Sequence, residues 1–327
     1  MRILVTGSAG HLGEGLVRML RAQGREVTGI DISPSSHTDQ VGSIADPAFV
    51  DRCMRGIGAV LHSATLHKPH VATHTRRDFV DTNITGTLNL LEAATRNGVG
   101  AFVFTSTTSL YGDALVPPPG APSAWITEDV VPVPKNIYGV TKVAAEDLCQ
   151  LFHRNEGLPC VVLRAARFFP EADDRRQVRD SFADANIKAN EFLYRRVDLR
   201  DVVDAHLLAL ERAGDIGFGR FIVSATTPFT REDLQQLHDD APAVVARHFP
   251  GYEEDYARLG WRMFAGIERV YVNAAARQAL GWKPVYGFAR VLERLRAGED
   301  PRSPLAVEVG AKGYHAQTFE DGPYPVN

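Results

Sequence analysis

The sequence of 327 residues predicts an α/β fold, a doubly wound parallel sheet with a smaller C-terminal part. Short apolar runs alternate with helical segments through the first half of the chain, which is the pattern of a parallel sheet covered by helices on both faces. A glycine-rich turn lies between the first apolar run and the first helical segment. Beyond residue 168 the alternation gives way to a charged, irregular stretch, which indicates a second, smaller part.

The first β-α unit opens the chain. An apolar run at 3–5 predicts a buried strand, and the segment 14–21 predicts a helix. Between them Gly7, Gly10 and Gly13 follow a G-x-x-G-x-x-G spacing. Glycine lets the backbone approach a phosphate closely, and the start of a helix offers unpaired N–H groups. Between a strand and a helix, this spacing predicts a Rossmann-type dinucleotide site.

An acidic residue at the end of the second strand predicts which dinucleotide binds. The strand at 25–31 ends in Asp31, 18 residues after Gly13. A carboxylate at this place accepts hydrogen bonds from an adenosine ribose. No Arg or Lys follows within 32–35, so a 2′-phosphate would find no partner and would face a carboxylate. The predicted cofactor is therefore NAD and not NADP.

The remaining elements continue the alternation. Three further strands, each with a helix upstream, are predicted at 58–62, 101–105 and 160–164, with the helices at 47–55, 81–97 and 138–155. One more helix at 201–212 and a strand at 221–224 return to the sheet. The proline-rich stretches at 117–122 and 132–134 predict a loop across the top of the sheet.

These elements suggest a division of the chain. Residues 1–166, completed by 199–225, form the predicted NAD-binding domain. Residues 167–198 and 226–327 form the predicted substrate-binding part and tail. Within the second part, 170–190 is expected to be a loop and helix over the binding cleft, 231–296 mostly helical, and the tail after Gly298 extended.

Composition narrows the class of partner. The net charge is −4, and no run of Lys and Arg suggests nucleic acid or an anionic membrane, so we expect a small-molecule substrate, no nucleic-acid partner and no membrane. No apolar stretch approaches membrane-spanning length, and the first strand begins too early to leave room for a signal peptide. The separated Cys53, Cys149 and Cys160 are typical of buried thiols in a reducing compartment. A cytoplasmic location is predicted.

Two polar clusters carry the predicted chemistry. Tyr138 and Lys142 stand at positions i and i+4 of a helical segment, so they share one face. A nearby ammonium favours the phenolate and lowers the pKa of a tyrosine toward the range of a general base. Upstream, five hydroxyl residues occupy 105–109 at the end of a strand. One of these hydroxyls can hold a substrate oxygen while Tyr138 moves its proton.

Together these pieces resemble the extended short-chain dehydrogenase/reductases of the NAD-dependent epimerase/dehydratase family, in particular the UDP-sugar 4-epimerases. The resemblance covers roughly residues 1–225, with a weaker match at 273–282. The matching pieces are 6–13, Asp31, 61–65, 83–92, 105–112, 138–142 and 201–206.

The resemblance implies a role for each matching residue. Tyr138 is the acid/base, Lys142 orients the nicotinamide ribose and lowers the pKa of the tyrosine, and Thr107 is the catalytic hydroxyl residue because it stands four residues before Tyr111. Asn83 falls at the asparagine beside the nicotinamide half of the site. The residues expected to contact NAD are Gly7, Ala9, Gly10, His11, Leu12, Gly13, Asp31, Ser43, Ile44, Ser63, Ala64, Thr65, Asn83, Thr105, Ser106, Tyr138 and Lys142.

Three departures from the family pattern bear on the reaction. Ser43 supplies only a hydroxyl where the family often has an acid to hold the adenine amine. Thr108 and Ser109 stand where the dehydratases and decarboxylases of this group have acids, which argues against both subclasses. Arg167 replaces an asparagine common in sugar-nucleotide enzymes.

The residues expected at the substrate are His67, Thr108 and Arg167. A guanidinium at 167 can grip a diphosphate or a carboxylate in bidentate fashion. The alternative is a surface arginine paired with Glu171 or Asp173. His67 belongs to a histidine cluster, but no carboxylate completes a metal site and a proline interrupts any helix, so no metal is expected.

The resemblance implies an enzyme that retains NAD. Tyr138 takes a hydroxyl proton while a hydride passes to NAD, and a keto intermediate forms. Return of the hydride to the other face gives an epimerase of the sugar-nucleotide type, which we favour. Release of NADH gives the alternative, an NAD-dependent dehydrogenase or reductase of a sugar, sugar acid or polyol-like alcohol. A non-catalytic NAD-binding scaffold is a minor alternative. Family habit suggests a homodimer packed through the helices at 81–97 and 138–155.

Overall fold

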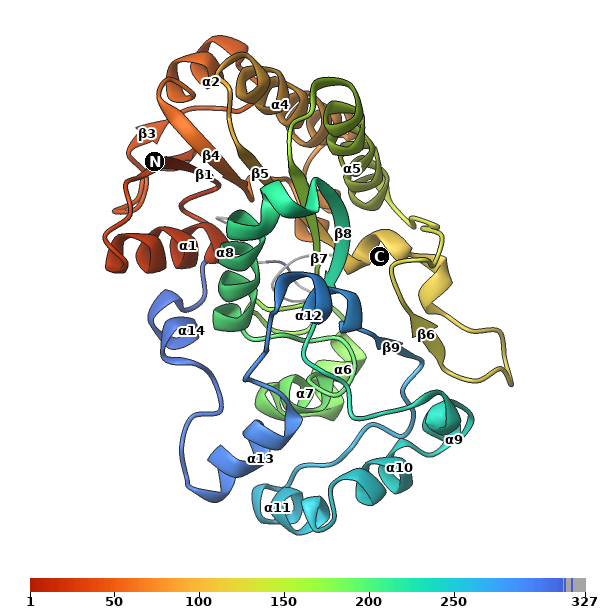
Figure 1. Ribbon diagram of the computed structural model, residues 1–327. Coiled ribbons are helices and arrows are strands. Elements are labelled where there is room, and N and C mark those ends of the chain that lie inside the picture. The colour runs from red at the N-terminus through yellow and green to blue at the C-terminus, as the bar shows by residue number, and fades with distance from the viewer. Residues whose placement is uncertain (314, 316–318, 320–327) are drawn as a thin grey trace.

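A parallel sheet occupies the centre of the computed structural model, which describes residues 1–313, 315 and 319 (Figure 1). Its seven strands follow the order β3-β2-β1-β4-β5-β7-β8, and neighbouring strands are parallel. The chain starts inside the sheet and winds outward in both directions, which confirms the predicted doubly wound fold. The strands are β1 (Arg2–Thr6), β2 (Val27–Asp31), β3 (Gln40–Val41), β4 (Ile57–His62), β5 (Ala101–Thr107), β7 (Cys160–Ala165) and β8 (Phe218–Val223).

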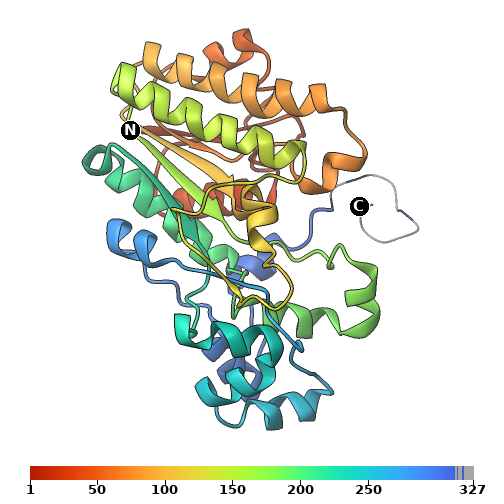
Figure 2. The ribbon, with the colours of Figure 1, turned by 90° about the vertical axis from the view of Figure 1, so that its right-hand side faces the viewer.

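Helices cover both faces of this sheet (Figure 2). The layer on one face contains α1 (His11–Ala22) and α8 (Leu199–Ile216), and the layer on the other contains α2 (Pro47–Cys53), α4 (Gly86–Arg96) and α5 (Ile137–Glu156). Successive side chains of a strand point to opposite faces. Ile3 and Val5 of β1 therefore pack in the core with α1 and α8, whereas Leu4 packs in the core on the other face.

Short helical turns fill the loops that leave the sheet near its carboxyl edge. Between β4 and α4 they are η1 (Lys68–Ala72), α3 (Arg76–Phe79) and the π-helical η2 (Val80–Thr85), and after β5 they are η3 (Thr108–Tyr111) and η4 (Asp113–Leu115). The helix predicted at 81–97 is thus a π-helical turn followed by α4. Such π turns are frequent at functional sites.

The rest of the chain builds a second core below the sheet. Buried side chains from 189–194 and 225–292 form it, with Tyr256 and Phe288 among the largest. Its helices are α7 (Asp184–Glu191), α9 (Leu234–Asp239), α10 (Ala241–His248), α11 (Tyr252–Leu259) and α13 (Phe288–Arg296). Two further helices of this part of the chain, α12 (Ala274–Leu280) and α14 (Pro304–Val309), pack in the core of the sheet. The short α6 (Arg176–Ser181) and η5 (Arg231–Asp233) complete the set. The mostly helical character predicted for 231–296 is confirmed.

Two elements differ from the sequence prediction. The tail after Gly298, expected to be extended, contains the helix α14, because Ser303 caps its start by accepting a hydrogen bond from the Ala306 N–H, and Pro304 fits the first turn. In addition, β6 (Ala124–Ile126) emerges from the proline-rich loop and pairs in parallel with β9 (Arg269–Tyr271). This pair joins the loop above the sheet to the second core.

The predicted boundaries fall at the ends of elements of the sheet. β7 ends at Ala165 and α8 begins at Leu199, so the segment 167–198 leaves the sheet between them. The division into two functional parts stays a prediction. Among the described helices, none combines the length and the apolar character needed to cross a bilayer.

Candidate active site

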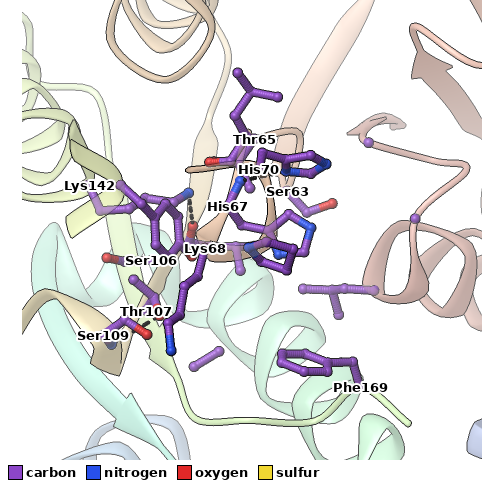
Figure 3. Close-up of a pocket in the computed structure, with 18 of the residues that line it drawn as sticks. Ser63, Thr65, His67, Lys68, His70, Ser106, Thr107, Ser109, Lys142 and Phe169 are labelled. Carbon is purple, nitrogen blue, oxygen red and sulfur yellow. Dashed lines mark hydrogen bonds between the residues drawn. The ribbon is translucent and has the colours of Figure 1, made fainter. Parts of the chain in front are cut away.

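A cavity of about 1040 Å³ opens at the carboxyl ends of β1, β4, β5 and β7. In a parallel sheet these strand ends meet at one edge, where ligands bind. Figure 3 shows Thr107, Ser109 and Lys142 on one side of the cavity and Phe169 on the other. The cavity has two ends. The cofactor end is lined by Gly7, 10–13, Asp31 and 42–44, and the substrate end by 165–169, Arg195 and Arg269.

The glycine-rich turn is packed too tightly for side chains. Gly7 has a positive φ of +74°, and a Cβ placed on it would lie 2.8 Å from the backbone N of Ala64. A Cβ on Gly13 would lie 1.9 Å from the carbonyl oxygen of Gly7. Bare backbone therefore surrounds the N-terminus of α1, an arrangement that suits a diphosphate. These residues fit the pyrophosphate of a dinucleotide.

Asp31 lies at the cofactor end of the cavity. Its Oδ2 accepts a hydrogen bond from the Ala9 N–H at 3.0 Å, and its Oδ1 accepts one from the Ser33 N–H at 2.9 Å. These contacts fix the carboxylate beside the cavity, where a ribose hydroxyl could donate to it. Ser43 and Ile44 also line the cavity, but the Ser43 hydroxyl accepts a hydrogen bond from the Ala45 N–H at 3.1 Å.

Asn83 does not line the cavity as predicted. Its Oδ1 accepts hydrogen bonds from the Thr65 hydroxyl at 2.9 Å and from the Leu66 N–H at 2.8 Å. Its Nδ2 donates to the Leu66 carbonyl and to the Thr141 hydroxyl, each at 2.9 Å. Because protein groups saturate the amide, Asn83 holds the loop after β4 in place, and its contact with NAD stays a prediction. Ala9 likewise lies behind the cavity wall.

Tyr138 and Thr107 both line the cavity, and the Thr107 hydroxyl lies close enough to lower the pKa of Tyr138. Asn136 caps α5 by accepting a hydrogen bond from the Gly139 N–H at 3.2 Å, which places Tyr138 in the first turn of the helix. Burial raises the pKa of Tyr138 to about 12, and the hydrogen bond with Thr107 counteracts this rise in part. The pair has the geometry of an acid/base group beside a hydroxyl that can hold a substrate oxygen.

Lys142 lies one turn further along α5, and its Nζ donates a hydrogen bond to the Thr105 carbonyl at 2.8 Å. Burial lowers the pKa of Lys142 to about 7, although the carboxylate of Glu146 acts to raise it. The expectation that Lys142 lowers the pKa of Tyr138 is not met here, since burial dominates that pKa and Thr107 supplies the opposing contact.

The hydroxyls at the end of β5 alternate in direction. Thr105 hydrogen-bonds Nε2 of His206 at 2.8 Å, whereas Ser106 donates to Oε1 of Glu146 at 2.6 Å. The two hydroxyls have different partners because neighbouring side chains of a strand point to opposite faces of the sheet. Both residues border the cavity, but Ser106 donates its hydroxyl proton to Glu146. Thr107 Oγ1 accepts a hydrogen bond from the Ser109 N–H at 3.1 Å, and Thr107 is the hydroxyl residue that acts on the pKa of Tyr138, which supports Thr107 over Ser106.

Arg167 stands at the substrate end, held by acidic side chains. It pairs with Asp173 at 2.6 Å, with Asp174 at 3.1 Å and with Glu191 at 3.2 Å. The predicted alternative, a pair with Asp173, is correct. Glu171, the other predicted partner, pairs with His11. Arg167 is not a surface residue, since its side chain is 14% exposed. Substrate binding by Arg167 stays a prediction.

His67 and Thr108 also line the cavity. Burial lowers the pKa of His67 well below its usual value, so the imidazole is neutral. Its neighbour His70 lies 4.7 Å away between ring centroids. No group of three or more His, Cys, Asp or Glu side chains suited to a metal ion is found within the described residues. Thr108 donates a long hydrogen bond of 3.5 Å to the Ala165 carbonyl.

Sequence reasoning missed three residues of the site. Lys68, from the loop after β4, reaches across to pair with Asp174 at the substrate end. These two residues are 106 positions apart, and no local pattern connects them. Glu146 was detectable, because it stands at i+4 from Lys142 and i+8 from Tyr138 and therefore shares their helix face.

Comparison with known proteins identifies the family. The model of the "NAD dependent epimerase/dehydratase family" matches residues 3–220. The chain belongs to this family.

Individual relatives extend this result. UDP-glucose 4-epimerase of Rhizobium meliloti (strain 1021) is 28% identical over 325 residues, covering 89% of this chain and 94% of the relative. dTDP-glucose 4,6-dehydratase of Streptomyces niveus is 35% identical over 184 residues, covering 50% of this chain and 53% of the relative.

Two solved structures have similar folds. A short-chain dehydrogenase/reductase superfamily protein of Agrobacterium tumefaciens with bound NAD has a TM-score of 0.65 at 26% identity, covering 91% of this chain and 96% of that one. UDP-glucose 4-epimerase of Thermotoga maritima with UDP-glucose has a TM-score of 0.60 at 25% identity, covering 91% and 99%.

Membership of the epimerase/dehydratase family confirms the predicted cofactor, NAD, and the predicted class, an NAD-dependent epimerase or oxidoreductase. It also confirms the Rossmann-type fold, on which the family's solved relatives superpose. The roles of individual residues in this family member stay predictions that rest on the geometry described above.

Proposed function

We propose that this protein is an NAD-dependent epimerase of a nucleotide sugar that works through a transient keto intermediate. The observation that carries the proposal is that Thr107, Tyr138 and Lys142 line one cavity, which extends from Asp31 to Arg167. Similarity to a UDP-glucose 4-epimerase over 89% of the chain supports the same reaction class. The cavity has room for a second molecule beside the dinucleotide.

The residues divide the chemistry among them. Thr107 holds the reacting hydroxyl of the sugar, and Tyr138 takes its proton as the hydroxyl becomes a ketone. Lys142 supplies positive charge behind this pair, with Glu146 favouring its protonated form. Bound NAD supplies reversible acceptance of a hydride. The stereocentre would be inverted if the ketone presented its opposite face when the hydride returned to carbon, and Tyr138 would then give the proton back to the oxygen.

The residues beyond Thr107 favour epimerisation over elimination. A dehydratase needs an acid or base placed to remove water from the neighbouring carbons, and here the positions that would provide it are Thr108 and Ser109. The Thr108 hydroxyl donates to a backbone carbonyl.

Incubation of the purified protein with UDP-glucose and with UDP-galactose tests the proposal. The expected result is that each sugar converts to the other, as seen in the proton NMR spectrum, with no accumulation of NADH at 340 nm. Stoichiometric NADH would instead establish the alternative, a dehydrogenase. The Tyr138→Phe variant is the matched control, since it removes only the hydroxyl that moves the proton.

A homodimer through α4 and α5 forms part of the proposal. Val140 and Leu151 on α5 are 49% and 38% exposed, which is unusual for large apolar side chains on a helix that also packs in a core. Light scattering should give twice the mass of the chain, and Leu151→Glu should reduce it to that of one chain.

A further inference from the structure

The carboxylate of Glu171 joins three segments that are distant in the sequence. Its Oε1 accepts hydrogen bonds from the backbone N–H groups of Lys312 and Gly313, at 2.9 and 3.1 Å, and contacts Nε2 of His11 at 2.9 Å. Burial raises the pKa of Glu171, but the hydrogen bonds from His11 and Lys312 lower it to about 2, so the carboxylate is ionised. We call this set of four residues the tail clasp.

The tail clasp lies at the cofactor end of the cavity. His11 is the first residue of α1, it belongs to the glycine-rich turn, and its side chain lines the cavity. Glu171 comes from the segment that follows β7, on the substrate side. Lys312 lies 301 positions after His11. The end of the chain thus returns to the turn that suits the pyrophosphate.

Further contacts fix the path of the chain toward the tail clasp. α14 packs against α1 and α8, as Figure 1 shows for α14 and α1. Ahead of α14, the Ser303 N–H donates to Asp198 Oδ2 at 3.1 Å in a buried position. Beyond it, the ammonium of Lys312 pairs with Glu14 of α1. These contacts tie the tail to the cofactor-binding half.

The tail also contacts the loop after β4. Nε2 of His315 lies 3.0 Å from the carbonyl oxygen of Pro69, and its ring lies 5.5 Å from that of His70. Pro69 and His70 both line the cavity. Described residues of the tail therefore contact both the glycine-rich turn and the loop after β4.

We propose that the tail clasp closes the cofactor end of the cavity and slows the release of NAD between turnovers. This inference rests on the proposed function, because an epimerase must keep NAD until the hydride returns, whereas a dehydrogenase must exchange it. Glu171 is then a positioning residue: it touches no reacting atom and acts by holding the tail against the turn. Release of NAD requires the hydrogen bonds to Lys312 and Gly313 to break.

A chase experiment on the full-length protein tests the tail clasp. Protein loaded with isotopically labelled NAD is freed of excess ligand and diluted into unlabelled NAD, and the label retained is followed over time. Glu171→Ala is expected to release NAD about tenfold faster or more, because hydrogen bonds to a charged acceptor are lost together. Lys312→Pro, which removes one donated N–H, should accelerate release in the same direction.

The matched control is Glu308→Ala on α14. Glu308 is 62% exposed and only approaches Arg18 at 3.6 Å, so this variant should retain NAD as the unchanged protein does. If Glu171→Ala folds poorly in the absence of NAD, Lys312→Pro decides by comparison with Lys312→Met, since both lose the ammonium that pairs with Glu14 and only the proline variant loses the N–H donated to Glu171. Release from both variants at the rate of the unchanged protein would overturn the proposal, as would loss of NAD from the unchanged protein within seconds.

The chase contains no sugar, so its outcome is independent of the reaction. Faster release from the variants of a protein that epimerises no nucleotide sugar would support the tail clasp and refute the proposed function. Unchanged release from the variants of a working epimerase would refute the tail clasp alone.

Discussion

The cofactor end and the substrate end of the cavity are built from different kinds of contact. At the cofactor end, backbone groups do most of the work: the glycine-rich turn packs against the backbone at Ala64, and Asp31 is fixed by two N–H groups. At the substrate end, charged side chains hold one another. Arg167 pairs with three carboxylates, and Lys68 reaches one of them from a loop more than 100 positions away.

This difference determines how each end tolerates change. Backbone packing depends on the presence or absence of a Cβ, so a single methyl group is enough to disturb the cofactor end. Buried ion pairs depend on the balance of charge, so at the substrate end the loss of one partner leaves others uncompensated. The five predictions that follow test the comparison, in order of decreasing effect.

Substitution at the junction of the two ends should affect chemistry alone. Tyr138→Phe is expected to lower kcat by about 10²–10⁴, the usual range for one positioned acid/base group, while NAD binds as before. Steady-state kinetics and calorimetric titration of NAD measure the two effects. Turnover near that of the unchanged protein would refute the mechanism.

At the substrate end, Arg167→Gln should destabilise the fold. Removing the guanidinium leaves Asp173, Asp174 and Glu191 short of one cation, which costs about 3–5 kcal/mol in free energy of unfolding. Urea titration measures this value. The control is Arg175→Gln, since Arg175 is 64% exposed and lies 4.0 Å from Asp173, so its loss should cost less than about 1 kcal/mol. A large rise in KM with unchanged stability would assign Arg167 to the substrate instead.

At the cofactor end, Gly13→Ala should weaken NAD binding by about 100-fold, close to 3 kcal/mol, because the added Cβ overlaps the Gly7 carbonyl and the turn must open. Gly214→Ala is the matched control, since nothing lies within 4 Å of a Cβ there. Calorimetry with NAD compares the two variants. Equal affinities would mean that the turn does not contact the dinucleotide.

Lys142 is a buried ionisable group, and its lowered pKa should make the stability of the fold depend on pH. Burial lowers the pKa of Lys142 to about 7 from its ordinary 10.5, so between these values only the unfolded chain keeps the proton. The folded protein should therefore gain stability as pH rises above about 7, by about 1 kcal/mol per pH unit relative to Lys142→Met. Denaturant unfolding of both proteins without NAD, from pH 6 to 9, measures the difference. A difference that does not change with pH would contradict the shift.

The smallest effect concerns the choice of dinucleotide. With Asp31 at the end of β2, NAD should bind about tenfold more tightly than NADP, or about 1.4 kcal/mol, because a 2′-phosphate would meet a carboxylate. Calorimetric titration with each dinucleotide gives the ratio, and Asp31→Asn should reduce it. Equal affinities in the unchanged protein would show that Asp31 does not face the ribose.

Much of the fold and part of the candidate site could be predicted, because local patterns of sequence encode them. The glycine spacing, the acid at the end of β2 and the Tyr138–Lys142 pair each depend on residues close in sequence, and the structure places all of them at one cavity. For Asn83 the contact with NAD stays a prediction, and the pattern could not indicate the partners of its amide, which come from a loop and from α5.

The sequence by itself therefore determined the sheet, the dinucleotide-binding turn and the helix face that carries Tyr138 and Lys142. Tertiary structure alone decided where the side chains of the substrate end and the tail meet, as in the pairing of Lys68 with Asp174 and the return of Lys312 to Glu171. The physical reason is the range of the interactions. Strands, turns and helix faces follow from the order of neighbouring residues, whereas an ion pair or a clasp forms only after packing has brought distant segments together.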